Sequence, residues 1–341
     1  MLNIDFPSRS YSVTVITSLW PSIAMARHAY ARSPRDGDDP VTFERVSAFM
    51  DVTAGSPHQA ELAAYLDTLV EQRCTRPEWW VVGDRSRAAL WSLPGVEVPS
   101  HVVLIETDWT DPQLVAGREL MARVHELAAG VGADELGHVV DSPPVPSQYQ
   151  EHPEARVELL EATGYELLRD GLRWLLSSRR AEARDGPLTF RTIADVGEEA
   201  FVDAIGATFA GTADNELTRD IEERGPREAA RQYLEDHKSL DHRPEWFELG
   251  YSGEELAGVI MGARNPTSAV IAYVGVVPEQ RGRGLAAPLV RRGTERLAAA
   301  GATEIRGDCD RDNIAMVKAF ERAGYGQFAR RRSYRHSLRQ A

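Results

Sequence analysis

The chain has few cysteines, no long apolar run and no excess of basic residues. Its two cysteines, Cys74 and Cys309, lie far apart, which argues against a disulfide framework and a Cys-rich metal site. No apolar stretch approaches the ~20 residues that a membrane-spanning helix needs. The N-terminal segment lacks the basic region and the small-residue cleavage site of a signal peptide. We therefore expect a cytoplasmic protein with no membrane partner and no bound metal.

The charge balance also limits the class of partner. The 52 Asp and Glu residues outnumber the 39 Lys and Arg residues, which leaves a formal charge of −13. A nucleic-acid partner calls for a basic face, so we expect none. The charge would suit a cationic small molecule, although an acidic balance also serves solubility alone. Nothing in the sequence predicts an oligomeric state.

The sequence repeats itself, in the same order, at spacings of roughly 160 to 170 residues. Arg-Pro-Glu-Trp occurs at 76–79 and again at 243–246, and VELLEATGYELLRDGLRW (157–174) parallels VKAFERAGYGQFARRRSY (317–334). Between these blocks, AAGVGADELGHVVD (128–141) parallels AAAGATEIRGDCD (298–310). We infer a duplicated domain, with copies at 1–180 and 187–341.

The second copy alternates strand and helix patterns, which predicts an α/β fold: two tandem domains, each with a mixed, mostly antiparallel sheet flanked by helices. A polar segment that ends in a turn signal links the copies, and a proline-rich insertion at 141–153 of the first copy is expected to be a surface loop. We expect strands at 188–193, 246–251, 256–263, 269–277, 304–310 and 325–334, and helices at 196–209, 215–237, 287–300 and 313–323.

One stretch of the second copy, YVGVVPEQRGRGLA (273–286), has the pattern of an anion-binding loop. An apolar strand is followed by a basic loop with two glycines and then by a helix. The glycines let the backbone approach a ligand, and the first helical amides have no intrahelical acceptor and favour a negative charge. Arginine side chains add charge-assisted donors. The pattern predicts a site for a pyrophosphate.

The residues from 187 to 335 resemble the GNAT superfamily of acyl-CoA-dependent N-acetyltransferases at two motifs. The first is VGVVPEQRGRGLA, with Arg281, Gly284 and Ala286 in the Arg-x-x-Gly-x-Ala core. The second is a helix that is led by Asn313 and ends in Gly324-Tyr325. The tandem arrangement also resembles the architecture of two-domain acetyltransferases such as mycothiol synthase.

The resemblance implies acetyl-CoA as the co-substrate, with its pantetheine arm between two splayed strands and its pyrophosphate on the loop. Asn313 would hydrogen-bond to the pantetheine arm, or it would cap its helix, and the two roles are compatible. The residues that the resemblance assigns to donor binding are Gly275, Val276, Val277, Arg281, Gly282, Arg283, Gly284, Leu285, Ala286, Ala287, Asn313 and Phe320.

The catalytic groups match the family less well. Family members often place a Glu base on the strand before the loop, where this chain offers Tyr273 but no carboxylate. A second family location lies five residues before the Asn, so the resemblance implies Asp308 as the candidate base, with Asp310 and Asp312 as competitors. The family's usual acid is a Tyr at the position of Phe320, and a phenyl ring cannot donate a proton. Tyr273 would replace it, or the thiolate would leave unaided.

The acceptor amine is expected near the loop that contains Asp214 and Glu216, whose carboxylates would receive an ammonium group; a solvated loop is the alternative. The matching loop of the first copy, TDWTDPQLVAGR (107–118), has lost the glycines, and its Asp111 would repel a phosphate. We therefore expect a degenerate first copy and a single active second copy.

The expected activity is direct transfer of an acetyl group from acetyl-CoA to a small-molecule primary amine. Three alternatives stay open at this point. In the first, the donor is another acyl-CoA or the acceptor is a protein amine. In the second, the chain is a non-catalytic acyl-CoA-binding or regulatory module. A dinucleotide-binding oxidoreductase is the weakest alternative, because Ala287 stands where Gly-x-Gly-x-x-Gly needs its third glycine.

Overall fold

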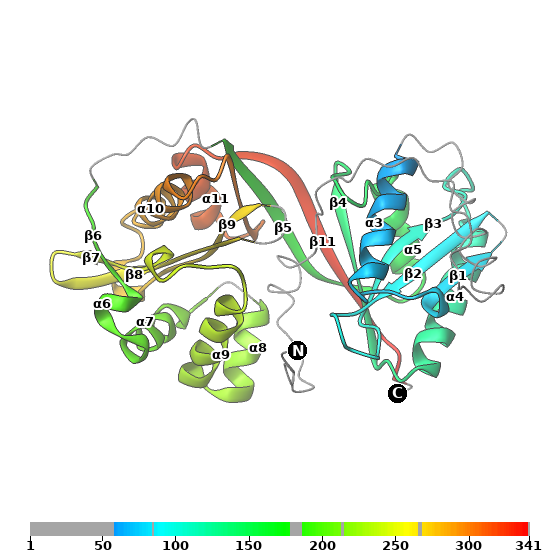
Figure 1. The fold of residues 1–341 in the computed structure, drawn as a ribbon, viewed down its shortest axis with the longest axis horizontal. Helices are drawn as coiled ribbons and strands as arrows, with labels where there is room; N and C mark the ends of the chain where they lie inside the picture. The colour runs from blue at the N-terminus through cyan, green and yellow to red at the C-terminus, as the bar shows by residue number, and fades with distance from the viewer. Residues whose placement is uncertain (1–57, 84, 178–185, 213–214, 265–267, 340–341) are drawn as a thin grey trace. The chain divides into compact units, whose positions relative to one another are not determined.

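The computed structural model describes residues 58–83, 85–177, 186–212, 215–264 and 268–339 (Figure 1). In the first part of the chain the elements are α3 (Gln59–Glu71), η1 (Pro77–Trp79), β1 (Trp80–Gly83), β2 (Ser86–Trp91), β3 (His101–Glu106), α4 (Val115–Gly130), β4 (Glu135–Ser142), α5 (Pro153–Ala162) and β5 (Glu166–Ser177). After them come β6 (Thr189–Thr192), α6 (Ile193–Val196), α7 (Glu198–Phe209), α8 (Asn215–Arg224), α9 (Pro226–Lys238), η3 (Pro244–Trp246), β7 (Phe247–Ser252), β8 (Glu255–Arg264), β9 (Ala269–Val276), η4 (Pro278–Gln280), α10 (Ala286–Ala299), β10 (Glu304–Asp310), α11 (Ile314–Arg322) and β11 (Gly326–Ser337).

The chain divides into two compact units. We call 22–171 together with 329–341 the N-terminal unit, and 172–328 the C-terminal unit. The strand order is β1-β2-β3-β4-β11 in the former and β5-β10-β9-β8-β7-β6 in the latter. The β3–β4 and β9–β10 pairs are parallel, and the other pairs with a described register are antiparallel. The α/β prediction of a mixed, mostly antiparallel sheet flanked by helices is confirmed.

The two units exchange their last strands. β5 follows α5 of the first copy, yet from Leu172 onward it belongs to the C-terminal unit. β11 ends the second copy, yet from Ala329 onward it belongs to the N-terminal unit, where it pairs with β4 from Arg330↔Ser142 to Ser337↔Glu135. Figure 1 shows β5 in green and β11 in red. The compact units therefore differ from the sequence intervals 1–180 and 187–341 by the later part of β5 and the later part of β11.

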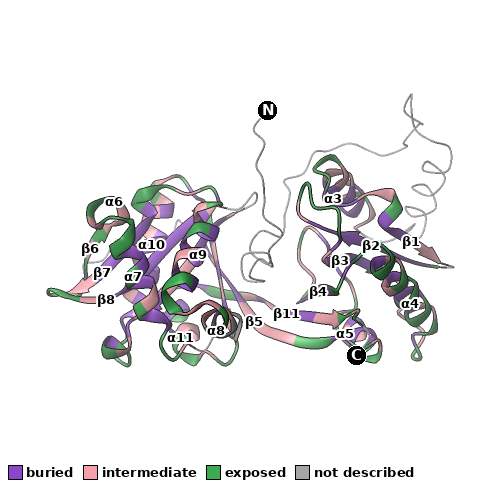
Figure 2. Ribbon diagram, turned by 90° about the horizontal axis from the view of Figure 1, so that it is seen from below, coloured by how far each residue is buried: buried purple, intermediate pink, exposed green. Residues whose placement is uncertain are grey.

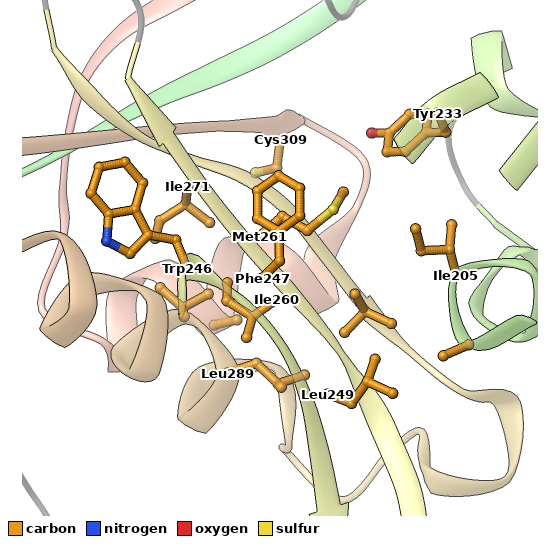
Figure 3. Packing of buried hydrophobic residues seen from close by; sticks show 14 of the residues in the cluster. Ile205, Tyr233, Trp246, Phe247, Leu249, Ile260, Met261, Ile271, Leu289 and Cys309 are labelled. Atoms are coloured by element: carbon orange, nitrogen blue, oxygen red, sulfur yellow. The ribbon is translucent and has the colours of Figure 1, made fainter. Parts of the chain in front are cut away.

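The core of the C-terminal unit has helices on both faces of the sheet. Phe247 on β7 stacks on Phe201 of α7, with ring centroids 6.1 Å apart, whereas the next residue faces α10. Figure 3 shows Leu289 of α10 and Ile205 of α7 on either side of these strands, and both are fully buried. Burying a side chain of this size stabilises the fold by about 1.5–3 kcal/mol. The outward sides of the helices carry the exposed residues (Figure 2).

Helix α10, which begins at the basic loop, is held to β7 by charge as well as by packing. Glu248 on β7 is 1% exposed and accepts hydrogen bonds from Arg292 at 2.8 and 2.9 Å and from Arg296 at 2.7 Å. A buried carboxylate needs such partners, because desolvation of an unpaired charge is costly. These contacts fix the helix, and with it the position of the loop.

The region expected as one helix at 215–237 forms two helices instead. α8 ends at Arg224, Gly225 has φ +81°, and Pro226 is the first residue of α9. Proline has no amide hydrogen and its ring clashes with the preceding turn, so it starts a helix but breaks one in the middle. The Gly225-Pro226 pair indicates this break between two helices, although the periodicity of charged and apolar residues continues across it.

The two units share one irregularity, which identifies matching positions. In β3, Val103 is an extra residue between the pairs Leu90↔Val102 and Ala89↔Leu104; in β9, Ala272 is the extra residue between Gly262↔Ile271 and Met261↔Tyr273. Each β-bulge lies two residues after a parallel pair, His101↔Gly137 in one unit and Val270↔Arg306 in the other. Val103 therefore corresponds to Ala272, and Gly137 corresponds to Arg306.

Candidate active site

The strands β9 and β10 separate where the bulge begins. Their parallel register covers Ala269↔Ile305 and Val270↔Arg306, although β9 continues to Val276 and β10 to Asp310. A backbone that leaves a ladder must find other hydrogen-bond partners. Within the described residues, no side chain donates to the carbonyl of Val274. An extended ligand with amide groups fits such an open strand edge.

His237 of α9 lies against the bulge. Its Nδ1 is 2.7 Å from the carbonyl of Tyr233, and its Nε2 is 3.3 Å from the carbonyl of Ala272. Burial lowers the pKa of His237, which keeps the ring neutral. A neutral ring has one N–H, and the shorter contact assigns it to Nδ1. His237 therefore packs on the bulge, with Nδ1 as the shorter of its two contacts to backbone carbonyls.

The basic loop has the backbone that an anion cradle requires. Gly282 and Gly284 have φ values of +75° and +76°, a region that other residues enter at a cost. Helix α10 has no side-chain cap, and within the described residues no backbone carbonyl accepts from the amides of Gly282, Gly284 or Leu285. Unsatisfied amides at a helix N-terminus bind anions, because the helix dipole adds to their positive ends.

The two arginines of the loop donate to oxygens of the protein itself. Arg281 donates to the carbonyls of Val276 at 3.1 Å, Thr208 at 2.9 Å and Gly211 at 3.3 Å, so it ties the loop to the end of α7. Arg283 donates to the side-chain oxygen of Gln280. Arg281 thus positions the loop through three carbonyls, and the phosphate contact expected of it stays a prediction.

Arg322 is a residue that the sequence did not single out. Its NH1 lies 3.3 Å from the point where a Cβ on Gly284 would be, so the last turn of α11 brings a guanidinium to the glycine loop. Among the described residues, Arg322 has no hydrogen-bond or ion-pair partner. A cation beside open amides suits a phosphate. The only sequence signal was a basic residue one turn before Gly324-Tyr325, and such residues are common at helix ends.

The three backbone positions expected to face the donor differ in their bonding. Gly275 has no room for a side chain, since a Cβ there would lie 2.6 Å from Thr208 Oγ1. The carbonyl of Val276 accepts from Arg281, and the amide of Val277 donates to Ala257 at 3.1 Å. Leu285 and Ala287 are buried at the start of α10, and Ala286 is partly buried there. Their donor contacts stay predictions.

Asn313 caps α11, since its Oδ1 accepts from the amide of Met316 at 3.2 Å. Its predicted contact with the donor stays a prediction. Phe320 is 1% exposed, stacks on Trp174 with centroids 5.7 Å apart, and covers Gly307. Phe320 is thus part of the core, and the donor contact expected of it stays a prediction.

Tyr273 is held by a short chain of hydroxyl groups. Its hydroxyl oxygen is 2.5 Å from Thr208 Oγ1, which is 2.6 Å from the carbonyl of Ile205. A carbonyl only accepts, so Thr208 gives its proton to Ile205 and Tyr273 gives its own to Thr208. To act as a general acid, Tyr273 would have to turn its proton away from Thr208. As placed, its hydroxyl proton is directed at Thr208.

Asp308 lies on the same face of the sheet as Tyr273. Gly307 faces α11 through Phe320, and successive strand residues point to opposite faces, so Asp308 faces the side of α7. Asp308 Oδ1 is 3.5 Å from Arg173 Nε, and the two side chains are 28% and 10% exposed. The structure thus brings both candidate catalytic residues to one face, on strands that separate, with a cation from the exchanged β5 beside the carboxylate.

The expected acceptor carboxylates cannot be located. Asp214 lies outside the described residues, and of Glu216 only the backbone, in the first turn of α8, is described. Their role stays a prediction.

Three comparisons bear on this site. Residues 212–325 match the profile of the acetyltransferase (GNAT) family. An acetyltransferase of Sodalis glossinidius is 33% identical over 88 residues, which are 26% of this chain and 62% of the relative. One from Pectobacterium atrosepticum is 32% identical over 88 residues with the same coverage. The chain thus spans 62% of the length of these curated relatives.

Among solved structures, the GCN5-related N-acetyltransferase from Sphaerobacter thermophilus aligns over 91% of this chain and 96% of its own, with a TM-score of 0.53 and 16% identity, a likeness of fold. The resemblance to mycothiol synthase stays a prediction. The matched residues contain the basic loop, the splayed strands and the Asn313 helix. The chain therefore carries a domain of the acetyltransferase (GNAT) family in its C-terminal half.

Proposed function

We propose that the chain is an acyl-CoA-dependent N-acyltransferase that acetylates a small-molecule primary amine in its C-terminal unit, by direct transfer from acetyl-CoA. The observation that carries the proposal is the combination of an open strand edge along β9 and an open-amide glycine loop immediately after it. The first suits the amide-bearing arm of a CoA donor, and the second suits its pyrophosphate. Arg322 adds a cation at Gly284.

The transfer itself asks little of the protein. An amine nitrogen that has lost its ammonium proton attacks the thioester carbonyl, a C–N bond forms, and the C–S bond breaks. Asp308 takes the proton directly or through a water molecule, and Tyr273 orients the reacting groups through its hydroxyl oxygen. The departing thiolate takes a proton from water, and the second proton that the nitrogen loses as the amide forms returns to that water, since Phe320 offers no proton and that of Tyr273 points to Thr208.

A second candidate, a non-catalytic acyl-CoA-binding module, is favoured by one observation. Arg173 Nε stands 3.5 Å from Asp308 Oδ1, so the candidate base already has an ion-pair partner. This candidate predicts CoA binding without turnover. The first candidate predicts acetyl transfer that depends on Asp308.

The test is a steady-state assay of the full chain with a panel of primary amines and with acetyl-, malonyl- and succinyl-CoA. We expect thiol release with acetyl-CoA and at least one small amine, and an Asp308→Asn variant that binds CoA normally but turns over about 10²- to 10⁴-fold more slowly, the usual contribution of a general base. Asp312→Asn tests the competing carboxylate, and we expect it to turn over at the rate of the unaltered chain. CoA binding without turnover of any amine would favour the binding module, and turnover with a protein amine or another donor alone would change the substrate class.

A further inference from the structure

The N-terminal unit has the same splayed strands as the C-terminal unit. The parallel register of β3 and β4 is one pair, His101↔Gly137, after which the strands separate at the Val103 bulge. By this register, Val103 corresponds to Ala272 and Ile105 to Val274, while Val139 and Leu104 stand where Asp308 and Tyr273 are. The fold of a donor site is thus present without the side chains of the proposed catalysis.

Side chains of the unit itself occupy this strand edge. Gln148 donates to the carbonyl of Val103 at 2.9 Å, and Arg156 donates to the carbonyl of Ile105. Gln150 holds Gln148 in place through a 2.9 Å hydrogen bond. These three side chains are at least nine-tenths buried. Arg156 supplies a donor at Ile105, which corresponds to Val274, whose carbonyl has no side-chain partner among the described residues. Gln148 bonds at Val103, which corresponds to Ala272, whose carbonyl lies 3.3 Å from His237 Nε2.

The residues responsible differ between the two copies. Gln148 and Gln150 lie in the proline-rich insertion, which is therefore a packed part of the unit rather than the surface loop that the sequence indicated. Arg156 corresponds to Met316 in the matched block, one residue before Val157 and Val317 respectively. The second copy thus has neither the insertion nor the arginine.

The helix N-terminus of the N-terminal unit is also occupied. The carboxylate of Asp111 accepts from the amide of Gln113 at 2.9 Å and from that of Val115, the first residue of α4, at 2.9 Å. α4 follows β3 as α10 follows β9. Asp111 therefore places two anionic oxygens on amides that correspond to those of the glycine loop, which in the C-terminal unit donate to no backbone carbonyl.

We propose that the N-terminal unit is a donor site filled by its own chain. Asp111 takes the place of the pyrophosphate and Gln148 and Arg156 that of the donor's amide-bearing arm, so each chain binds one acyl-CoA, in the C-terminal unit. The claim that each chain binds one acyl-CoA rests on the proposed function of the C-terminal unit. The claim that the N-terminal site is filled by its own chain is independent of that function, because the contacts that fill it are present whatever the C-terminal unit binds.

Binding stoichiometry tests whether each chain binds one acyl-CoA. Calorimetric titration of the full chain with CoA is expected to give one site per chain, and Gly284→Asp, which adds a charge and a side chain at the loop, is expected to weaken binding at least 100-fold and leave no residual site. Gly301→Asp is the control, since Gly301 has a similar φ of +88° with no neighbour within 4 Å of an added Cβ. Two sites, or residual binding by folded Gly284→Asp, would overturn the proposal and leave the proposed function standing. No binding by the unaltered chain would overturn both.

Hydrogen exchange of the backbone amides tests whether the N-terminal site is filled by its own chain, without any change to the C-terminal unit. CoA is expected to slow exchange in 271–287 and to leave 102–118 unchanged, and protection of 102–118 would overturn the proposal. Asp111→Ala is expected to speed the exchange of the Gln113 and Val115 amides at least tenfold, because both lose their acceptor. Exchange at the original rate in this variant, with circular dichroism showing a folded chain, would show that Asp111 does not occupy the helix terminus.

Discussion

The glycine loop offers a sharp test of donor binding through Gly284→Ala. At φ +76° an alanine is strained, and its Cβ would lie 3.3 Å from NH1 of Arg322. The strain costs about 1–2 kcal/mol of folding stability. The added methyl group also displaces the guanidinium and moves the phosphate away from the loop amides.

The effect on affinity follows from the bonds that are lost. One hydrogen bond to a charged group contributes about 1.5–3 kcal/mol, and each 1.4 kcal/mol is tenfold in affinity. Loss of a single phosphate contact therefore raises the Kd for CoA about 10- to 150-fold. Isothermal titration calorimetry measures this Kd, and thermal denaturation measures the stability of the same sample.

Gly301→Ala separates strain from binding. Gly301, after the end of α10, has φ +88° and an open surrounding, so alanine there costs similar stability without approaching the loop. We expect the two variants to lose similar stability and only Gly284→Ala to lose affinity. If Gly284→Ala binds CoA as tightly as Gly301→Ala, the loop is not a phosphate cradle, and the assignment of the donor site is wrong.

Three further outcomes are expected. Tyr273→Phe lowers kcat less than about 10-fold, because the tyrosine proton points to Thr208; a loss in the range of ~10²–10⁴ would instead mark a general acid. Residues 187–341 expressed alone do not form a soluble monomer, because β11 lacks β4 and β10 lacks β5; a cooperative thermal transition of that fragment would contradict the exchange of strands. The N-terminal unit loses stability as the pH falls from about 6.5 toward 4: burial lowers the pKa of His101 to about 4 and that of His138 to about 3, so the unfolded chain binds more protons across this range. Thermal denaturation at fixed ionic strength measures this loss, and a Tm that stays constant between pH 6.5 and 4 would refute it.

Local patterns in the sequence predicted what local forces determine. The strand at 304–310 matches β10, and the helix after the loop was expected within one residue of α10, because alternation and helical spacing are set by neighbours in the chain. The glycine loop was found for the same reason. The break at Gly225-Pro226 was equally local, and it was missed because the charged periodicity continues across it.

Tertiary placement explains what the sequence did not predict. Arg281 and Arg322 are both arginines near the loop, and only the positions of α7 and α11 decide that the first supports the backbone and the second reaches Gly284. The insertion looked like a surface loop because it is polar and rich in proline. Its glutamines are buried because an open strand edge needs donors, and that need arises from the splay of β3 and β4.

Strand β5 gives the first copy a structural role in the C-terminal unit, although the donor site of the first copy is filled. β5 brings Trp174 against Phe320, and its indole Nε1 donates to Cys309 Sγ at 3.3 Å, so the first copy builds part of the core beneath β10 and α11. The neighbouring Arg173 reaches the other face and stands beside Asp308. Removing the first copy would expose the edge of β10 and take away the cation next to the candidate base. Filling the N-terminal site with Asp111, Gln148 and Arg156 keeps that unit stable without a ligand, so it can supply β5 whether or not a donor is bound.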